Sequence, residues 1–206
     1  MISDETNRGI IRTQYRNSIV KELFRKSIHI CSALVPTLLT VAYRPVVGFL
    51  SAALGIYIVS ELLRMHSIDV PVIARITEVA ARKRDENKFV LGPVTLVLGI
   101  IISALLLKPQ AARIGIYALA FGDGLASLGG KLFGRVHIPF THGKTAAGSL
   151  TCFTAVFCSA FGVCGDVRAA LILACAAMFV EVIPLGDFDN IIIPVLIGAL
   201  AQYLLP

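Results

Sequence analysis

FGDGLASLGGKLFGRVHIPFTHGKTAAGS, residues 121–149, is the stretch around which the rest of the chain is arranged. Asp123 stands inside an apolar run and is followed by six glycines and three cations, Lys131, Arg135 and Lys144. A charged residue at the centre of a membrane helix costs at least about 2.5 kcal/mol, so an aspartate there indicates a function. Glycine lets backbone N–H groups approach an anion, lysine and arginine neutralise it, and carboxylates bind magnesium. The stretch is therefore typical of a site for a magnesium nucleotide.

Close helix packing or a Walker loop would account for less of this stretch. Glycines alone would permit close packing between helices, as small residues do in membrane bundles. Packing, however, gives no role to Asp123 or to the three cations. A Walker loop is excluded, because Ile138 stands where that motif requires its first glycine ahead of Gly143-Lys144-Thr145.

The composition predicts an all-α, polytopic membrane protein with a single membrane domain. Of the 206 residues, 56% are hydrophobic and only 16% are charged, which is typical of a membrane helix bundle. The five cysteines lie in or beside apolar runs without CxxC spacing, which predicts packing roles. The N-terminal region is polar and basic, so we expect no cleaved signal.

Residues 1–27 predict an amphipathic helix on the cytoplasmic membrane surface, and residues 28–206 predict the transmembrane domain. About seven apolar stretches approach the length that spans a bilayer. They are Ile28–Tyr43, Pro45–Leu63, Phe89–Leu107, Ala111–Gly130, Ala146–Val163, Arg168–Pro184 and Asn190–Leu205. The long segment 64–88 between the second and third stretches predicts a short interfacial helix.

The distribution of cations predicts a cytoplasmic N-terminus. With that orientation, 15 of the 19 Lys and Arg residues lie in inner segments. The outer segments hold only Arg44, Lys108, Arg113 and Arg168. The positive-inside rule favours this arrangement, and an odd number of spans places the C-terminus outside. The net charge of +6 therefore reflects topology and does not indicate nucleic-acid binding.

This topology gathers the polar residues of the spans at the cytoplasmic face. They are His29, Glu61 with Arg64, Asp123, Glu181, Asp187, Asp189 and Asn190. Several have simpler roles open to them: Glu61 would pair with Arg64 one helical turn away, His29 would be an interfacial histidine, and Asp187 or Asp189 would cap a helix. Asp123 and Glu181 are the least easily explained in that way.

The residues resemble a known family at several points. Gly122-Asp123-x-x-Ala126, Gly130-x-x-x-Gly134-Arg135 and Gly143-Lys144-Thr145-x-x-Gly148-Ser149 look like the core of the dolichol kinase, phytol kinase and CTP-dependent diacylglycerol kinase family. Arg25-Lys26-x-x-His29, Glu61 and the late Glu181 with Asp189-Asn190-x-x-x-Pro194 are also similar to its pattern. The matches run from about residue 25 to residue 194.

The resemblance implies a CTP-dependent kinase that transfers the γ-phosphoryl group to the hydroxyl of a membrane lipid such as a polyprenol, dolichol, phytol or diacylglycerol. Phosphoryl transfer needs mainly positioning and charge neutralisation, which the residues above would supply. Asp123, Glu181 and Glu61 are the candidate catalytic groups. The expected nucleotide-binding residues are Gly122, Gly130, Lys131, Gly134, Arg135, Gly143, Lys144, Thr145, Gly148 and Ser149. Asp123, Asp189 and Asn190 would hold Mg²⁺ or another divalent cation, and Arg25, Lys26, His29 and Arg64 would lie near the lipid.

Two alternatives remain open from the sequence. CDP-lipid synthases share an Asp-x-x-Ala and Lys-Thr-x-x-Gly pattern but usually carry Ser-Pro-Lys-Lys where this chain has Thr141-His142-Gly143-Lys144. An ion-coupled transporter would use Asp123 and Glu181 as an ion path, but its acids would be spread across the bilayer depth. The sequence does not identify the lipid, the proton-accepting carboxylate or the oligomeric state, and CTP enters from the resemblance alone.

Overall fold

The computed structural model describes residues 20, 22–68, 70–71, 77, 88–141 and 143–205. Helices make up most of this part of the chain, so the predicted all-α class is confirmed. The one isolated β-bridge within these ranges joins His137 to Thr145. Most of the amphipathic segment predicted over residues 1–27, and most of the interfacial helix predicted within 64–88, lie outside the described residues.

The helical elements follow the predicted apolar stretches closely. Residues 22–31 are helical and are followed by η1 (Ser32–Leu34), α2 (Val35–Met65), α4 (Gly92–Leu106), α5 (Pro109–Tyr117), η3 (Ala118–Asp123), α6 (Gly124–Phe133), α7 (Ala146–Cys164), α8 (Val167–Val182) and α9 (Asp189–Leu204). The predicted stretch Ala111–Gly130 corresponds to α5, η3 and α6, which succeed one another without a gap. Of these, η3 is a π-helical segment, in which the backbone hydrogen bonds are displaced by one residue.

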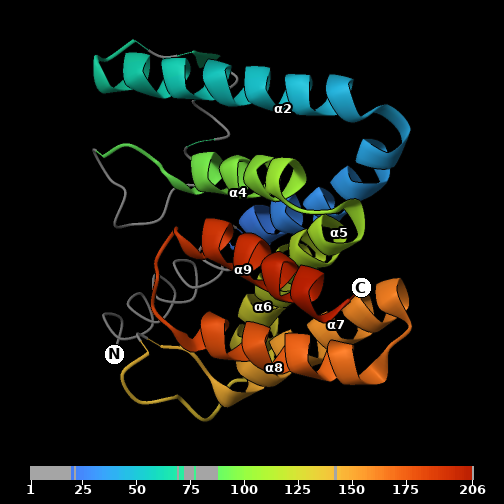
Figure 1. Ribbon diagram of the computed structural model, residues 1–206. Helices are drawn as coiled ribbons and strands as arrows, with labels where there is room; N and C mark the ends of the chain where they lie inside the picture. The colour runs from blue at the N-terminus through green and yellow to red at the C-terminus, as the bar shows by residue number, and fades with distance from the viewer. Residues whose placement is uncertain are drawn as a thin grey trace, which may run out of the picture.

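The first two predicted stretches are joined by a bend inside α2. Ala42 has non-helical dihedral angles, φ −147° and ψ 67°. Pro45 follows three residues later, and it has no N–H with which to bond the carbonyl of Val41. Beyond the bend, α2 runs back along the edge of the bundle (Figure 1). The boundary predicted near Arg44 is therefore a proline-associated bend.

The core forms where α9 packs against α4, α5 and α8, and where α7 packs against α6 and α8. Close approach of α9 depends on two glycines. A Cβ built on Gly99 would lie 2.1 Å from the carbonyl oxygen of Asn190, and one on Gly115 would lie 2.1 Å from that of Pro194. Larger residues at these positions would push α9 away from α4 and α5.

Side-chain and glycine caps fix the ends of α7 and α8. Thr145 accepts a hydrogen bond from Gly148 N at 3.1 Å and begins α7. Gly165 ends α7 in the left-handed conformation, with φ 69°. Asp166 then accepts bonds from the backbone of Arg168 and Ala169 and begins α8. These caps make the tight reversal between α7 and α8.

The connections gather at two opposite ends of the bundle (Figure 1). The loop before α7, residues 134–145, and the link from α8 to α9, residues 183–188, lie at one end. The bend of α2, the link from α4 to α5 and the link from α7 to α8 lie at the other. The elements that carry the predicted site residues therefore meet at the first end.

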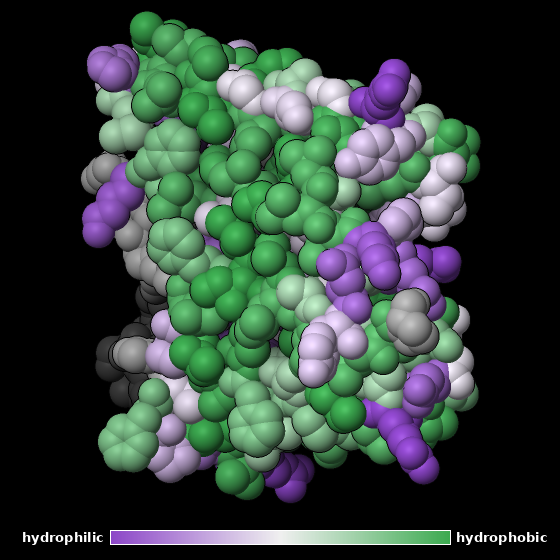
Figure 2. Space-filling model, viewed as in Figure 1, coloured by the Kyte–Doolittle hydropathy of each residue, from purple (hydrophilic) through white to green (hydrophobic). Residues whose placement is uncertain are grey.

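Within the described residues, two helical stretches are long and apolar enough to cross a membrane, Glu22–Met65 and Ala146–Cys164. Only 11% and 28% of their most apolar windows are buried, whereas the core helix of a soluble protein is mostly buried. Large apolar side chains lie exposed along α2, including Val41 at 83% and Phe49 at 73%. Figure 2 shows a broad apolar face with hydrophilic groups toward its sides. These surfaces are consistent with a membrane protein.

Candidate functional site

A polar cavity of about 690 Å³ lies at the end of the bundle where the loop before α7 meets the α8–α9 link. Its walls come from helix 22–31, η3, α6, the loop 134–145, the end of α8 and the start of α9. The titratable residues that line it are Glu22, Arg25, Lys26, Asp123, Lys131, His137, Lys144, Glu181 and Asp189. Small-molecule sites commonly occupy about 300–1,000 Å³, so the cavity has room for a nucleotide phosphate chain.

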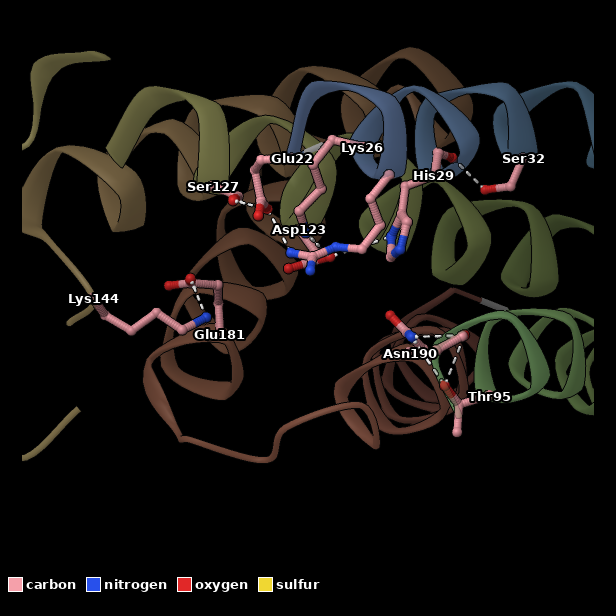
Figure 3. Close-up of polar contacts among 12 residues, drawn as sticks. Glu22, Lys26, His29, Ser32, Thr95, Asp123, Ser127, Lys144, Glu181 and Asn190 are labelled. Atoms are coloured by element: carbon pink, nitrogen blue, oxygen red, sulfur yellow. Dashed lines mark hydrogen bonds and ion pairs between the residues drawn. The ribbon is translucent and has the colours of Figure 1, made fainter. Parts of the chain in front are cut away.

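Asp123 is the last residue of η3 and is buried at the inner wall of this cavity. The Lys26 ammonium donates to Asp123 Oδ2 at 2.5 Å, and His29 Nδ1 lies 3.2 Å from the same oxygen (Figure 3). Lys26 and His29 are buried as well. Because they lie three residues apart on helix 22–31, they face Asp123 together. The N-terminal helix therefore supplies the counter-charge for the acid in the apolar bundle.

Glu22, on the same helix as Lys26, contacts two of the other cations that line the cavity, Arg25 and Lys131. Its Oε1 accepts from Arg25 Nη2 at 2.5 Å and from Ser127 Oγ at 2.7 Å (Figure 3). Its Oε2 lies 3.3 Å from Lys131 Nζ. These contacts connect helix 22–31 to α6 and hold Lys131 at the rim, where its side chain is 40% exposed.

The loop before α7 is a folded hairpin that presents Lys144. Ile138 N donates to Lys144 O at 2.9 Å, and Ala146 N donates to Val136 O at 3.0 Å. Lys144 Nζ then reaches across to Glu181 Oε1 at 2.6 Å (Figure 3). The loop and the end of α8 are thus joined by an ion pair whose carboxylate is buried.

Two of the polar residues predicted to bind the nucleotide form hydrogen bonds within the protein. Thr145 caps α7, and Ser149 Oγ donates to Glu181 Oε2 at 3.4 Å. Ser149 therefore helps to orient the carboxylate that Lys144 contacts.

Most of the predicted nucleotide-binding glycines stand where helices approach closely. A Cβ on Gly134 would lie 2.7 Å from the Thr145 side chain, and one on Gly122 would lie 2.8 Å from the Val156 side chain. A Cβ on Gly148 would lie 2.9 Å from the carbonyl oxygen of Ala126. Gly130, Gly134 and Gly148 also line the cavity. Close packing thus explains why these positions are glycines, and three of them also border the cavity.

Gly143 differs from the other glycines of the motif. Its φ is 97°, in the region that glycine adopts most easily, and nothing lies within 4 Å of a Cβ built there. The residue immediately precedes Lys144 and lines the cavity. Its backbone conformation, not its packing, accounts for the glycine.

Seven predicted site residues do not line the cavity: Gly122, His29 and Ser149, described above, and Glu61, Arg64, Arg135 and Asn190. Glu61 is buried and accepts from Val90 N at 2.8 Å and from Arg64 Nη2 at 2.7 Å, which holds the end of α2 near the start of α4. Asn190 Nδ2 donates to Thr95 Oγ1 at 3.0 Å on α4 (Figure 3). Arg135 is exposed and, like Glu61, Arg64 and Asn190, does not line the cavity.

The carboxylates in the cavity fit a metal that is held largely by its nucleotide. Within the described part of the chain, no cluster of three or more His, Cys, Asp or Glu side chains is arranged to hold a metal ion. Magnesium is commonly bound through one or two carboxylates together with substrate phosphates. Glu181 and Asp189 both line the cavity and are the carboxylates that could hold such a metal.

Sequence reasoning missed part of the lining. Glu22, Ser127, His137 and Thr141 all face the cavity. For Glu22 a signal exists: it stands seven residues before His29 and four before Lys26, on one face of a helix. No comparable pattern marks His137, which reaches the site through the fold of its loop.

Comparison with known proteins gives three distant relatives. The chain is 32% identical over 143 residues to a probable phytol kinase 1, chloroplastic, of Oryza sativa subsp. japonica, covering 60% of this chain and 45% of that protein. It is 28% identical over 142 residues to phytol kinase 1, chloroplastic, of Arabidopsis thaliana, covering 67% of this chain and 46% of the relative. It is 26% identical over 209 residues to a probable phytol kinase 1, chloroplastic, of Glycine max, covering 91% and 68%.

These matches confirm the predicted resemblance to phytol kinases. The chain covers less than half the length of the rice and Arabidopsis proteins. No protein-family model matches the chain, and no solved structure matches it.

Proposed function

We propose that this protein is a membrane lipid-alcohol kinase that transfers the γ-phosphoryl group of CTP to a lipid hydroxyl at the polar cavity. The observation that carries the proposal is the convergence of buried Asp123 and Glu181 with Lys26, Lys131 and Lys144 at one end of an apolar bundle. Three relatives named phytol kinases support both the kinase and the lipid alcohol. CTP as the donor follows from the resemblance.

Each lysine in the cavity already contacts a carboxylate. Lys26 pairs with Asp123, Lys131 with Glu22 and Lys144 with Glu181. A magnesium nucleotide would bring anionic phosphates for Lys131 and Lys144 and a cation for the carboxylates that these lysines release, while Lys26 would stay with Asp123, so no buried charge would be left alone. This exchange would place the γ-phosphate between the loop of Lys144 and the wall formed by Asp123.

The acceptor hydroxyl would meet the phosphate at Asp123. In this proposal Asp123 accepts the hydroxyl proton, while Lys26 and His29 hold its carboxylate in position. Lys131 and Lys144 hold the triphosphate. Glu181 and Asp189 would hold Mg²⁺, which when bound supplies charge neutralisation to the phosphate oxygens.

We further propose that seven helices cross the membrane, with the cavity on the cytoplasmic side. The loop 134–145 and the α8–α9 link share one end of the bundle, and the cation-poor links share the other (Figure 1). The positive-inside rule places the end that carries Lys131 and Lys144 in the cytoplasm. A lipid alcohol would then reach Asp123 sideways from the inner leaflet.

The test follows the fate of the phosphorus atoms of CTP. The purified protein is incubated with CTP labelled at either the γ- or the α-phosphorus, and with either phytol or a lipid phosphate as the acceptor. We expect γ-label in the lipid and CDP in solution, with Asp123→Asn as the inactive control. A CDP-lipid synthase would instead join the α-label to a lipid phosphate and release pyrophosphate, and that result would overturn the kinase assignment.

A further inference from the structure

A second cavity, of about 660 Å³, lies beside the first and is lined mainly by apolar side chains. One wall is the turn from helix 22–31 into α2, with Ile30 and Leu34. The second is α5 and η3, with Tyr117 and Phe121, and the third is the outer half of α7, with Gly162. This apolar groove runs between the N-terminal helix and α7.

The apolar groove begins at the residues that surround Asp123. Ile30 follows His29, whose Nδ1 lies 3.2 Å from Asp123 Oδ2. A Cβ built on Gly124, the residue after Asp123, would lie 3.3 Å from the Ile30 side chain. Phe121 stands two residues before Asp123 on η3. The groove therefore lies next to the wall of the polar cavity at which the acceptor hydroxyl would react.

The groove extends from this junction toward the opposite end of the bundle. From Phe121 to Arg113 there are eight helical residues, which span about 12 Å at 1.5 Å per residue. The rings of Tyr117 and Phe121 lie 5.5 Å apart along this wall. At the far end, Arg113 lies 5.4 Å from the Tyr117 ring centroid and its Nε donates to the Tyr117 hydroxyl at 3.1 Å. The polar groups of this wall thus bind each other and leave an apolar surface.

We propose that the apolar groove binds the hydrocarbon tail of the lipid alcohol, with the tail directed from Asp123 toward Arg113. The inference rests on the proposed kinase function, because the position of the groove beside Asp123 gives the tail its direction. A single groove fits one hydrocarbon chain, so the expected substrate is an alcohol with a single tail. Each methylene group of the tail that the groove buries adds to the binding free energy, so the affinity should grow with tail length until the groove is filled.

Gly162 offers a way to fill the groove without disturbing the protein. Nothing lies within 4 Å of a Cβ built on Gly162, and the residue lines the groove. Gly162→Phe would place a ring in the space assigned to the tail. Gly55→Phe is the matched control, because Gly55 also lies in a helix with nothing within 4 Å of its Cβ, and it does not line the groove.

We expect Gly162→Phe to raise KM for phytol at least about tenfold, the loss expected from displacing two or three buried methylene groups. KM for the short alcohol prenol and KM for CTP should stay within about twofold of wild type, and Gly55→Phe should change none of the three. Equal losses for phytol and prenol, or an unchanged KM for phytol in a folded Gly162→Phe protein, would overturn the groove assignment.

Photo-crosslinking provides a readout that does not depend on turnover. Phytol that carries a diazirine near the end of its tail should label the peptides that contain Leu34 and Gly162, and excess unlabelled phytol should abolish the labelling. Labelling elsewhere, or labelling that phytol does not compete, contradicts the groove. If the protein phosphorylates no alcohol but competed labelling of the groove is observed, the proposed kinase function fails while the binding site stands.

Discussion

Removing the ammonium of Lys26 should destabilise the protein strongly, because it leaves the Asp123 carboxylate buried without its closest partner. The side chains of Lys26 and Asp123 are only 3% and 6% exposed, and their charged atoms lie 2.5 Å apart. Breaking a buried ion pair from one side typically costs about 3–5 kcal/mol. We therefore expect Lys26→Met, which keeps the aliphatic chain, to lose about that much free energy of unfolding.

A double variant separates stability from activity. Lys26→Met with Asp123→Asn removes both charges, so most of the lost stability should return and the two changes should not add. Activity should not return. Asp123→Asn alone should lower kcat/KM at least about 100-fold, or about 2.7 kcal/mol in transition-state stabilisation, because the amide cannot accept the hydroxyl proton.

Lys131→Met serves as the control for the stability measurement. Lys131 lies 3.3 Å from Glu22, but its side chain is 40% exposed, and exposed pairs contribute only about 0–1 kcal/mol. Equilibrium unfolding of the three variants in mixed detergent micelles gives the free energies. A Lys26→Met protein as stable as wild type, or no more destabilised than Lys131→Met, would refute the argument from burial.

Three further predictions follow from the same contacts. Lys144→Ala should raise KM for CTP with little change in KM for phytol, because it removes the ammonium group that contacts Glu181 and is proposed to bind the triphosphate. Steady-state kinetics would show the opposite pattern if the loop contacted the lipid. Glu61→Gln should lower stability by about 1–3 kcal/mol, because Glu61 carries a buried contact with Val90 N, and should leave kcat unchanged; a selective loss of kcat would make Glu61 catalytic. Reporter fusions after Lys144 and Pro206 should report a cytoplasmic loop and an external C-terminus, and a cytoplasmic C-terminus would contradict the seven-span arrangement.

Helix positions could be predicted well because the apolar stretches are bounded by residues that start or end helices. Asp166 caps α8, and Gly165 ends α7, as their types suggest. The π-helical geometry of η3 could not be predicted, because it depends on how that segment packs among its neighbours. The bend at Ala42 was predicted only as a boundary between two apolar stretches, although Pro45 marks its position.

Site residues could be predicted where a charge stands in an apolar setting, since burial of a charge requires a partner or a function. Asp123 and Glu181 carry this signal, and both line the polar cavity. Their partners could not be identified, because ion pairs such as Lys26 with Asp123 join residues far apart in the chain. The same limit applies to Asn190, which faces Thr95 on α4.

Helix packing at the glycine-rich stretch also sets the position of the proposed anion site. A Cβ on Gly129 would lie 2.2 Å from Thr151 Oγ1, and one on Gly148 would lie 2.9 Å from the carbonyl oxygen of Ala126, so side chains at these positions would separate α6 from α7. Lys131 is carried by α6, and Lys144 stands two residues before α7, so the distance between these helices sets the distance between the two cations. Close packing at these glycines therefore brings both lysines to the rim of one cavity, where the proposed anion site requires them.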